Sequence, residues 1–280
     1  MHRIIESDNL IALQKLLPEY EGKIDVMPID PPYNTAIPYI GYQDSGYVDG
    51  WTEFMRPRLE LAYRLLSPKG VMFIHIDENE FCNLMALCQE IFGSRNVMSM
   101  IWKKVNERFD RSRKEKPLES GIRRIHEFVV VRFKDREHTV LSPIHQPVWD
   151  GEKYVDAIRP LETVIDDMGT NASAKDELAE LLGARNLFAT PKPVRMIEEF
   201  IRTASGKNSV VLDFFAGSGT TGHAVMKLNA EDGGKREFIL ITNNENDICQ
   251  KVTVPRIQKA KKLCGCADSI VYEGSNFDTQ

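Results

Sequence analysis

Residues 210–222 read VVLDFFAGSGTTG, which places an apolar run, a glycine-rich turn and the start of a helical pattern in immediate succession. Gly217 and Gly219 let the backbone approach a ligand closely, and the first turn of a following helix offers unpaired N–H groups. Together with Gly222 they fit the G-x-G-x-x-G spacing of dinucleotide-binding turns, although a single match of this kind is weak. No Gly-Lys-Ser or Gly-Lys-Thr follows, which excludes a P-loop nucleotide hydrolase.

A second motif, Asp30-Pro31-Pro32-Tyr33, directly follows the apolar run at residues 24–29. The two prolines fix the backbone and remove two N–H donors, so they predict a rigid rim at the end of a strand, where open α/β sheets bind ligands. The Asp30 carboxylate and the Pro31 carbonyl are two acceptors suited to an exocyclic NH₂ group, and the Tyr33 ring offers a stacking face. An ordinary proline-rich turn is the alternative, but this tetrapeptide arises by chance only about once in a thousand such chains.

Short apolar runs alternate with amphipathic stretches along the chain, which predicts an α/β fold with a mostly parallel sheet and helices on both faces. The expected strands are residues 24–29, 71–76, 97–102, 127–133, 209–214 and 237–242. The expected helices are residues 51–66, 79–92, 174–182, 194–203, 220–228 and 254–263. Pro68-Lys69-Gly70 is expected to separate a helix from a strand, and Ser173 to be the N-cap of the helix that follows it.

Composition sets the broad class of the protein. The 280 residues are 42% hydrophobic and 28% charged, which excludes intrinsic disorder and favours one α/β domain with an insertion, or two small domains. The apolar runs have strand length and the N-terminus lacks a signal-peptide core, so a cytosolic protein is expected. Five cysteines without a CxxC pair predict neither a disulfide framework nor a metal site; they are Cys82, Cys88, Cys249, Cys264 and Cys266.

Charge is unevenly distributed. Residues 103–136 hold twelve Lys or Arg against six Asp or Glu, so this segment carries +6 and the rest of the chain −11, for a net charge of −5. The loop at residues 104–125 has neither a helical nor a strand period, and it is predicted to contact the phosphates of a nucleic acid. A solvated loop at a dimer interface is the alternative. The predicted DNA-binding residues are Lys103, Lys104, Arg108, Arg111, Arg113, Lys114, Arg123 and Arg124.

The two motifs together resemble those of the β-class amino-methyltransferases of DNA. In that family a D/N/S-P-P-Y/F/W tetrapeptide holds the target amine, and D-x-F-x-G-x-G binds S-adenosylmethionine; here these are residues 30–33 and 213–219. The order is that of the β class, with the tetrapeptide first and the cofactor loop last. The chain is most similar to the modification (Mod) subunits of type III restriction-modification systems. The resemblance covers residues 1–102 and 187–262, with further matching stretches at residues 8–10, 70–80, 190–193 and 217–234.

The resemblance implies a fold and a domain organisation. It implies a Rossmann-like, S-adenosylmethionine-dependent methyltransferase fold with a mostly parallel, seven-stranded and circularly permuted sheet. Residues 1–136 and 187–280 would form the catalytic domain, and residues 137–186 a small target-recognition insertion beside the basic loop. Mod subunits are much longer and carry a large recognition domain, so site recognition in this chain is expected to be reduced, borrowed from another chain, or performed by loops.

The resemblance also implies roles for individual residues in a site-specific transfer of a methyl group to the N6 amine of adenine in DNA. Asp30 and the Pro31 carbonyl would bind the amine of the flipped adenine, Pro32 would complete the rim, and Tyr33 would stack on the base. The acid that binds the cofactor ribose is expected to be Glu245. The implied cofactor-binding residues are Asp8, Asp30, Thr190, Lys192, Asp213, Phe214, Phe215, Gly217, Ser218, Gly219, Thr220 and Glu245.

The two motifs also leave several other activities open. An N4-cytosine methyltransferase usually has Ser at the position of Asp30, and an adenine-N6 RNA methyltransferase usually has Trp at that of Tyr33. An NAD-dependent oxidoreductase would leave the tetrapeptide unexplained, and a non-catalytic DNA-binding subunit would not need both motifs intact. The expected partners are double-stranded DNA and either a second copy of the chain or a restriction or recognition subunit. No membrane is expected as a partner, and the expected location is the cytoplasm of a bacterium or archaeon, or of a phage host.

Overall fold

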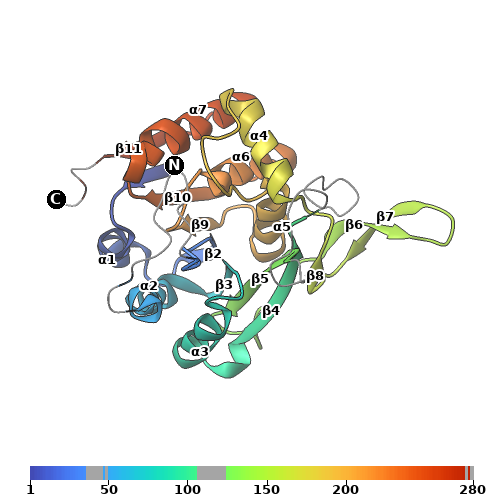
Figure 1. Cartoon of the computed structure of the whole chain (residues 1–280), viewed down its shortest axis with the longest axis horizontal. Helices are drawn as coiled ribbons and strands as arrows, with labels where there is room; N and C mark the ends of the chain where they lie inside the picture. The colour runs from blue at the N-terminus through green and yellow to red at the C-terminus, as the bar shows by residue number, and fades with distance from the viewer. Residues whose placement is uncertain (36–46, 48–49, 106–123, 275–276, 278–280) are drawn as a thin grey trace, which may run out of the picture.

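The computed structural model describes residues 1–35, 47, 50–105, 124–274 and 277. Its centre is a sheet of nine strands in the order β11-β1-β10-β9-β2-β3-β5-β4-β8, with helices on both faces (Figure 1). The strands are β1 (His2–Glu6), β2 (Ile24–Ile29), β3 (Leu66–Ile76), β4 (Val97–Lys103), β5 (His126–Phe133), β8 (Val164–Ile165), β9 (Val210–Asp213), β10 (Glu237–Thr242) and β11 (Ile270–Glu273).

The sheet is mostly parallel, as predicted. β5 is the exception, since it runs antiparallel to β3 and to β4. The expectation of seven strands was too low for the described residues, because the short strands β8 and β11 pair parallel to β4 and β1 and extend the sheet at its two edges. β2, which comes early in the chain, lies beside β9, which comes late. The predicted permuted order therefore brings the two motifs next to each other in space.

Alternation of side chains across the sheet builds a separate apolar core on each face. Val26 and Val211 belong to one core and their neighbours Met27 and Leu212 to the other, since successive side chains of a strand point to opposite faces. Strands buried on both faces read as continuous apolar runs, which is why β2, β9 and β10 were evident in the sequence. One face is covered by α1 (Asn9–Tyr20), α2 (Trp51–Leu65) and α3 (Phe81–Phe92), the other by α5 (Val194–Ala204), α6 (Thr220–Asp232) and α7 (Val254–Leu263).

Several expected boundaries were wrong: α6 ends at Asp232 and not at residue 228, α3 begins at Phe81 and not at residue 79, and the boundaries of β3 and α4 differ for identifiable reasons. Strand β3 begins at Leu66, and the predicted break at residues 68–70 is an irregularity of register within it. A Cβ on Gly70 would lie 2.8 Å from the backbone oxygen of Ile24, so this bend has room only for glycine. Helix α4 (Asn171–Leu182) is capped by Thr170 and not by Ser173, because the two side chains form a reciprocal capping box with each other's backbone N–H.

The segment at residues 137–186 contains a feature that the sequence did not predict. β6 (Ile144–Trp149) and β7 (Tyr154–Arg159) form an antiparallel hairpin that projects from the body of the molecule (Figure 1). Buried Ile144 anchors its base in the core under α5. β1 and α1 were also missed. Short helical turns complete the described chain at η1 (Ser94–Asn96), η3 (Glu245–Asp247) and η4 (Cys249–Thr253).

Among the described residues, no helix combines the length and the apolar character that crossing a membrane requires.

Candidate active site

A cavity of about 460 Å³ opens at the carboxyl ends of β2, β9 and β10. These parallel strands end at the same edge of the sheet, so the segments that follow them converge there. All the predicted catalytic and cofactor-binding residues except Gly219 line this cavity. They are Asp8, Asp30, Pro31, Pro32, Tyr33, Thr190, Lys192, Asp213, Phe214, Phe215, Gly217, Ser218, Thr220 and Glu245.

Asp30 lies in a cluster of charged side chains on one wall of the cavity. Its Oδ2 is 2.6 Å from Nζ of Lys192, and its Oδ1 accepts a hydrogen bond of 2.7 Å from the hydroxyl of Tyr33. The same hydroxyl is 3.0 Å from Oε2 of Glu127, whose Oε1 accepts a hydrogen bond of 3.2 Å from Nζ of Lys104. Two carboxylates and two ammonium groups therefore balance each other in charge.

Burial and neighbouring charges fix the protonation of this cluster. Burial raises the pKa of Tyr33 well above its usual range, and the negative charges of Asp30 and Glu127 act in the same direction, so the hydroxyl stays protonated. Burial by itself would lower the pKa of Lys192, but the carboxylates of Asp30 and Glu127 outweigh it and raise this pKa. Lys192 is only 5% exposed and remains a cation paired with Asp30.

Glu127 was not predicted as a site residue. It is 4% exposed, lies near the start of β5 and touches Tyr33 and Lys104, while its Oε2 is 3.6 Å from Nζ of Lys192. A signal was present in the sequence, since a buried carboxylate within an apolar strand is costly unless it is paired. Nothing in the two motifs, however, pointed to a residue almost a hundred positions after Asp30.

The glycine-rich turn forms the second wall. Gly217 has φ of +48° and Gly219 has φ of +80°, a backbone conformation that favours glycine. A Cβ on Gly217 would lie 3.1 Å from Cζ of Phe188, so the turn is closely packed against this ring. Gly219 does not line the cavity; it precedes α6 and lies under Thr253, whose hydroxyl donates to the Gly217 carbonyl over 2.5 Å.

Asp213 is buried where β9 enters this turn. Its two oxygens accept hydrogen bonds from the hydroxyl of Thr221 at 2.6 Å and from the N–H of Phe215 at 3.0 Å. Burial raises its pKa to about 7, although both hydrogen bonds favour the ionised form. Through these two hydrogen bonds, Asp213 links the start of the turn to α6 and fixes the backbone of Phe215, which lines the cavity.

The amino end of α1 contributes the third wall. Asp8 is the N-cap of this helix and accepts a hydrogen bond of 2.8 Å from the N–H of Leu10, while its carboxylate is half exposed. The next residue, Asn9, donates to the carbonyl of Phe214 over 2.8 Å and accepts from Arg58 over 2.6 Å. These bonds tie the helix to the glycine-rich turn, so Asp8 faces the same cavity as Gly217.

A buried guanidinium supports the turn from outside the cavity. Nη1 of Arg256, from α7, donates to the hydroxyls of Ser218 at 2.9 Å and of Thr220 at 2.8 Å. Burial lowers the pKa of Arg256 to about 10. The sequence predicted this helix but no role for Arg256, because its partners Ser218 and Thr220 are nearly forty positions away. Glu245 reaches the cavity from the short helix η3, after β10.

Few of the predicted DNA-binding residues are described by the structure. Lys104 points into the cavity toward Glu127, Arg124 forms an ion pair with Glu78, and Lys103 ends β4. The remaining predictions lie outside the described residues; they are Arg108, Arg111, Arg113, Lys114 and Arg123.

Sequence comparisons find relatives of this chain among restriction-modification proteins. The chain is 29% identical to the StyLTI Mod subunit of a type III restriction-modification enzyme from Salmonella typhimurium, over 85% of this chain and 52% of that protein. It is 27% identical to the type II methyltransferase M.KpnI of Klebsiella pneumoniae, over 85% of this chain and 79% of that protein. The chain spans just over half the length of the two type III Mod subunits from Salmonella typhimurium and phage P1 that it matches.

Solved structures share the fold. The M1.HpyAVI–SAM complex superposes with a TM-score of 0.54 at 21% identity, covering 94% of this chain and 98% of that one. TTHA0409 of Thermus thermophilus, complexed with S-adenosyl-L-methionine, superposes with a TM-score of 0.58 at 15% identity, covering 98% and 99%. A family model described as DNA methylase matches residues 24–252, from the strand before the tetrapeptide to the start of the last helical segment. This chain therefore belongs to the DNA methylase family.

Proposed function

We propose that this chain transfers a methyl group from S-adenosylmethionine to the N6 amine of a flipped-out adenine in DNA. One observation carries the proposal: the Asp30-Pro31-Pro32-Tyr33 rim and the glycine-rich turn face the same cavity. An amine held at the rim is then within reach of a cofactor held at the turn. An oxidoreductase would use only the turn and leave the rim without a role.

The cavity suits the proposed cofactor in size and in chemistry. Its volume of about 460 Å³ lies in the range of small-molecule sites, about 300–1,000 Å³. Gly217 adds no side chain of its own to the cavity, and the Phe188 ring packs against it as part of the cavity wall. Phe215 would contact the methionine part, while the carboxylates of Asp8 and Glu245 would accept hydrogen bonds from the adenine amine and the ribose hydroxyls. When bound, S-adenosylmethionine supplies a methyl group on a positively charged sulfonium.

The residues of the rim would prepare the amine for attack. The lone pair of the N6 amine is delocalised into the adenine ring, which makes the nitrogen a poor nucleophile. Hydrogen bonds from its two N–H groups to the Asp30 carboxylate and the Pro31 carbonyl would localise that pair on the nitrogen. The Asp30 carboxylate would accept the proton that the methylated nitrogen loses. Most of the rate enhancement would then come from positioning, with attack at about 3–3.5 Å.

The charged cluster suggests how the site is held before DNA binds. Asp30 is engaged by Lys192 and Tyr33, so the incoming amine would replace the Tyr33 hydroxyl at Oδ1 and leave the Lys192 ion pair in place. The freed Tyr33 ring would stack on the base, which partly offsets the few kcal/mol that flipping the base costs. Glu127 would keep the Tyr33 hydroxyl as its partner during this exchange.

The insertion and the basic loop are the proposed contacts to DNA. The hairpin β6–β7 and helix α4 lie in the segment at residues 137–186, which we assign to target recognition, and the basic loop at residues 104–125 would contact phosphates. Because the type III Mod relatives are about twice as long, a restriction or recognition subunit is a proposed partner, as is a second copy of this chain. The proposed location is the cytoplasm.

Methyl transfer from labelled S-adenosylmethionine into mixed-sequence duplex DNA, followed by mass spectrometry of the nucleosides, tests the proposal. The expected product is N6-methyladenine. Asp30→Ala should reduce turnover by at least about 100-fold while cofactor binding persists, and Glu60→Ala, at an exposed acid on α2 outside the cavity, serves as the matched control. N4-methylcytosine as the product, methylation of RNA alone, or full turnover by Asp30→Ala would each overturn the assignment.

A further inference from the structure

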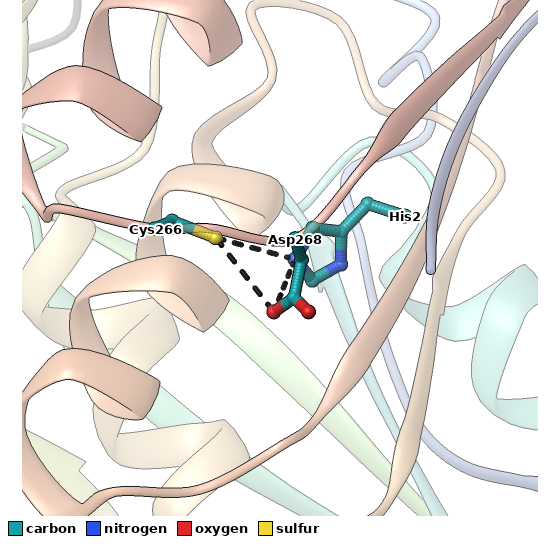
Figure 2. Close-up of side chains that lie close together, drawn as sticks. All are labelled: His2, Cys266 and Asp268. Atoms are coloured by element: carbon teal, nitrogen blue, oxygen red, sulfur yellow. Dashed lines mark hydrogen bonds and ion pairs between the residues drawn. The ribbon is translucent and has the colours of Figure 1, made fainter.

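Three residues from the two ends of the described chain meet where β1 begins and just after α7 ends. His2 opens β1, while Cys266 and Asp268 lie between α7 and β11 (Figure 2). None of the three lines the cavity of the candidate active site. The imidazole of His2 is buried, Cys266 is partly exposed and Asp268 is exposed, so the group sits at the surface with its nitrogen ligand on the inner side.

The three side-chain atoms form a nearly equilateral triangle. Nε2 of His2 is 3.7 Å from Sγ of Cys266 and 3.7 Å from Oδ2 of Asp268, and these last two atoms are 3.8 Å apart. The nitrogen-to-oxygen separation is too long for a hydrogen bond, which is about 2.7–3.2 Å. The point equidistant from all three atoms lies about 2.2 Å from each, which agrees with zinc bonds to nitrogen, oxygen and sulfur of about 2.0–2.3 Å.

We propose that His2, Cys266 and Asp268 bind a zinc ion, with water in the fourth position. A neutral imidazole, a thiolate and a carboxylate are a donor set that suits this borderline-soft cation. The site is structural, because it lies outside the catalytic cavity and joins β1 to the segment between α7 and β11.

The backbone and ring around the three ligands hold them in position without a metal. The His2 ring stacks on Phe238 with centroids 4.1 Å apart and planes 2° apart. The Phe238 N–H donates to Nδ1 over a long 3.4 Å, so Nε2 carries the ring proton without a metal. Zinc binding at Nε2 would move that proton to Nδ1, and the ring would turn slightly away from the Phe238 N–H. Burial lowers the pKa of His2 to about 4, so the imidazole is neutral at neutral pH.

The other two ligands lie on a segment tied to α7. The N–H of Cys266 donates to the carbonyl of Lys261 over 3.0 Å, and Nζ of Lys261 donates to the carbonyl of Asp268 over 2.6 Å. The N–H of His2 in turn donates to the carbonyl of Ser269 over 3.0 Å, which fixes β1 beside them. The sequence could not show this site, since its ligands are 264 positions apart and lack a CxxC pair.

The test measures zinc binding by the full chain, expressed without an affinity tag and treated with a chelator. We expect one equivalent of Zn²⁺ per chain in a competition titration, and an intense thiolate-to-metal absorption band when Co²⁺ is used as the probe. Cys266→Ser and Asp268→Asn should each weaken zinc binding by roughly 10–100-fold or more. Cys264→Ser, which changes the neighbouring cysteine, should bind Zn²⁺ like the unmodified chain.

Zn²⁺ should also raise the melting temperature of the unmodified chain and of Cys264→Ser, and at the same zinc concentration should raise that of Asp268→Asn by much less. Asp268 is exposed, so this variant keeps the fold and serves if Cys266→Ser proves unstable. No zinc in the unmodified chain, or equal losses from Cys264→Ser and Cys266→Ser, would overturn the proposal. The zinc proposal is tested by measuring metal content, and the proposed function by measuring methyl transfer. Failure of either proposal would therefore leave the other unaffected.

Discussion

Glu127 shows how a residue outside both motifs enters the site. Its carboxylate shares the Tyr33 hydroxyl with Asp30, and it offsets the charge of Lys192 and Lys104. Without it, two ammonium groups would face a single carboxylate. We therefore assign Glu127 as a positioning residue that holds the side chains of Tyr33 and Lys192 in place beside the Asp30 carboxylate.

Glu127→Gln should lower kcat for methyl transfer by roughly 10–100-fold, because Lys192 and Lys104 would then compete for Asp30. The Kd for S-adenosylmethionine should hardly change, since Glu127 lies on the rim side of the cavity. Glu80→Gln is the control, because Glu80 is equally buried but is bonded to Asn34 and Asn83. Single-turnover kinetics and cofactor titration separate the two effects; a Gln variant with the original kcat would contradict the role.

Asp213 gives a prediction about pH and stability. Burial raises its pKa from 3.8 to about 7, so between about pH 4 and 7 the folded chain holds a proton that the unfolded chain has lost. The contribution of Asp213 to the free energy of unfolding therefore decreases as the pH rises through this window. Burial also raises the pKa of Asp77, Glu177, Glu198 and Glu199, so the contribution of Asp213 is best measured as a difference between two variants.

Asp213→Asn removes that dependence and keeps the acceptor for the Phe215 N–H. Relative to the unmodified chain, the variant should gain roughly 2–3 kcal/mol in free energy of unfolding between pH 5 and pH 7.5. Urea unfolding at both pH values measures the gain, and Asp166→Asn, at an exposed position, should show none. A stability difference that stays constant with pH would contradict a raised pKa of Asp213.

At the scale of elements, the hairpin β6–β7 is separable from the catalytic body. His145 and Ile158 are paired across it, and Ile158 is 65% exposed, whereas Ile144 at the base is buried in the core. Residues beyond the His145–Ile158 pair therefore contribute little to the core. An Asn-Gly turn fits between two paired residues of a hairpin, so the tip can be removed without changing its base.

Replacing residues 146–157 by Asn-Gly should leave the melting temperature and the Kd for S-adenosylmethionine nearly unchanged. If the hairpin reads DNA, the variant should lose the sequence preference of methylation, which is mapped by sequencing methylated DNA. A matched control replaces only residues 150–153, the turn of the hairpin, by Asn-Gly and retains the strand pairs. Unaltered site preference after the longer deletion would assign recognition to another part of the chain.

At the scale of the whole molecule, the charges predict a protein that binds DNA through one segment of an acidic chain. Residues 103–136 carry +6 against −11 elsewhere, so long-range attraction is weak and local contacts dominate. Lys104 and Arg124 already have carboxylate partners within the described chain. The phosphate contacts are therefore expected from the remaining basic residues of the loop.

A triple change of Arg111, Arg113 and Lys114 to Ala should weaken DNA binding and reduce the slope of log K against log salt by up to about 3. Fluorescence anisotropy across a salt series measures both quantities. The control changes Lys69, Lys259 and Lys262, which are exposed on other elements, to Ala. An unchanged slope for the loop variant, or an equal loss for the control, would exclude the loop as the main phosphate contact.

The sequence by itself determined the fold class, the permuted order of the motifs and the residues of the two motifs that line the cavity. It did so because buried strands read as apolar runs and because the turns that follow β2 and β9 need particular residues, such as Gly217 at φ of +48°. Elements without such patterns were missed, among them β1 and the hairpin β6–β7. Residue type and spacing along the chain were therefore sufficient to predict the buried strands and their turns, but not β1 or the hairpin β6–β7.

Only the tertiary structure decided which distant side chains share one environment. Glu127 joins Asp30 and Lys192, Arg256 reaches Ser218, and His2 meets Cys266, in each case between segments far apart in the chain. Such contacts depend on strand order and on helix packing across the sheet, which are properties of the whole molecule. Residue type and spacing do not encode them locally, because the partners become neighbours only when the sheet is complete.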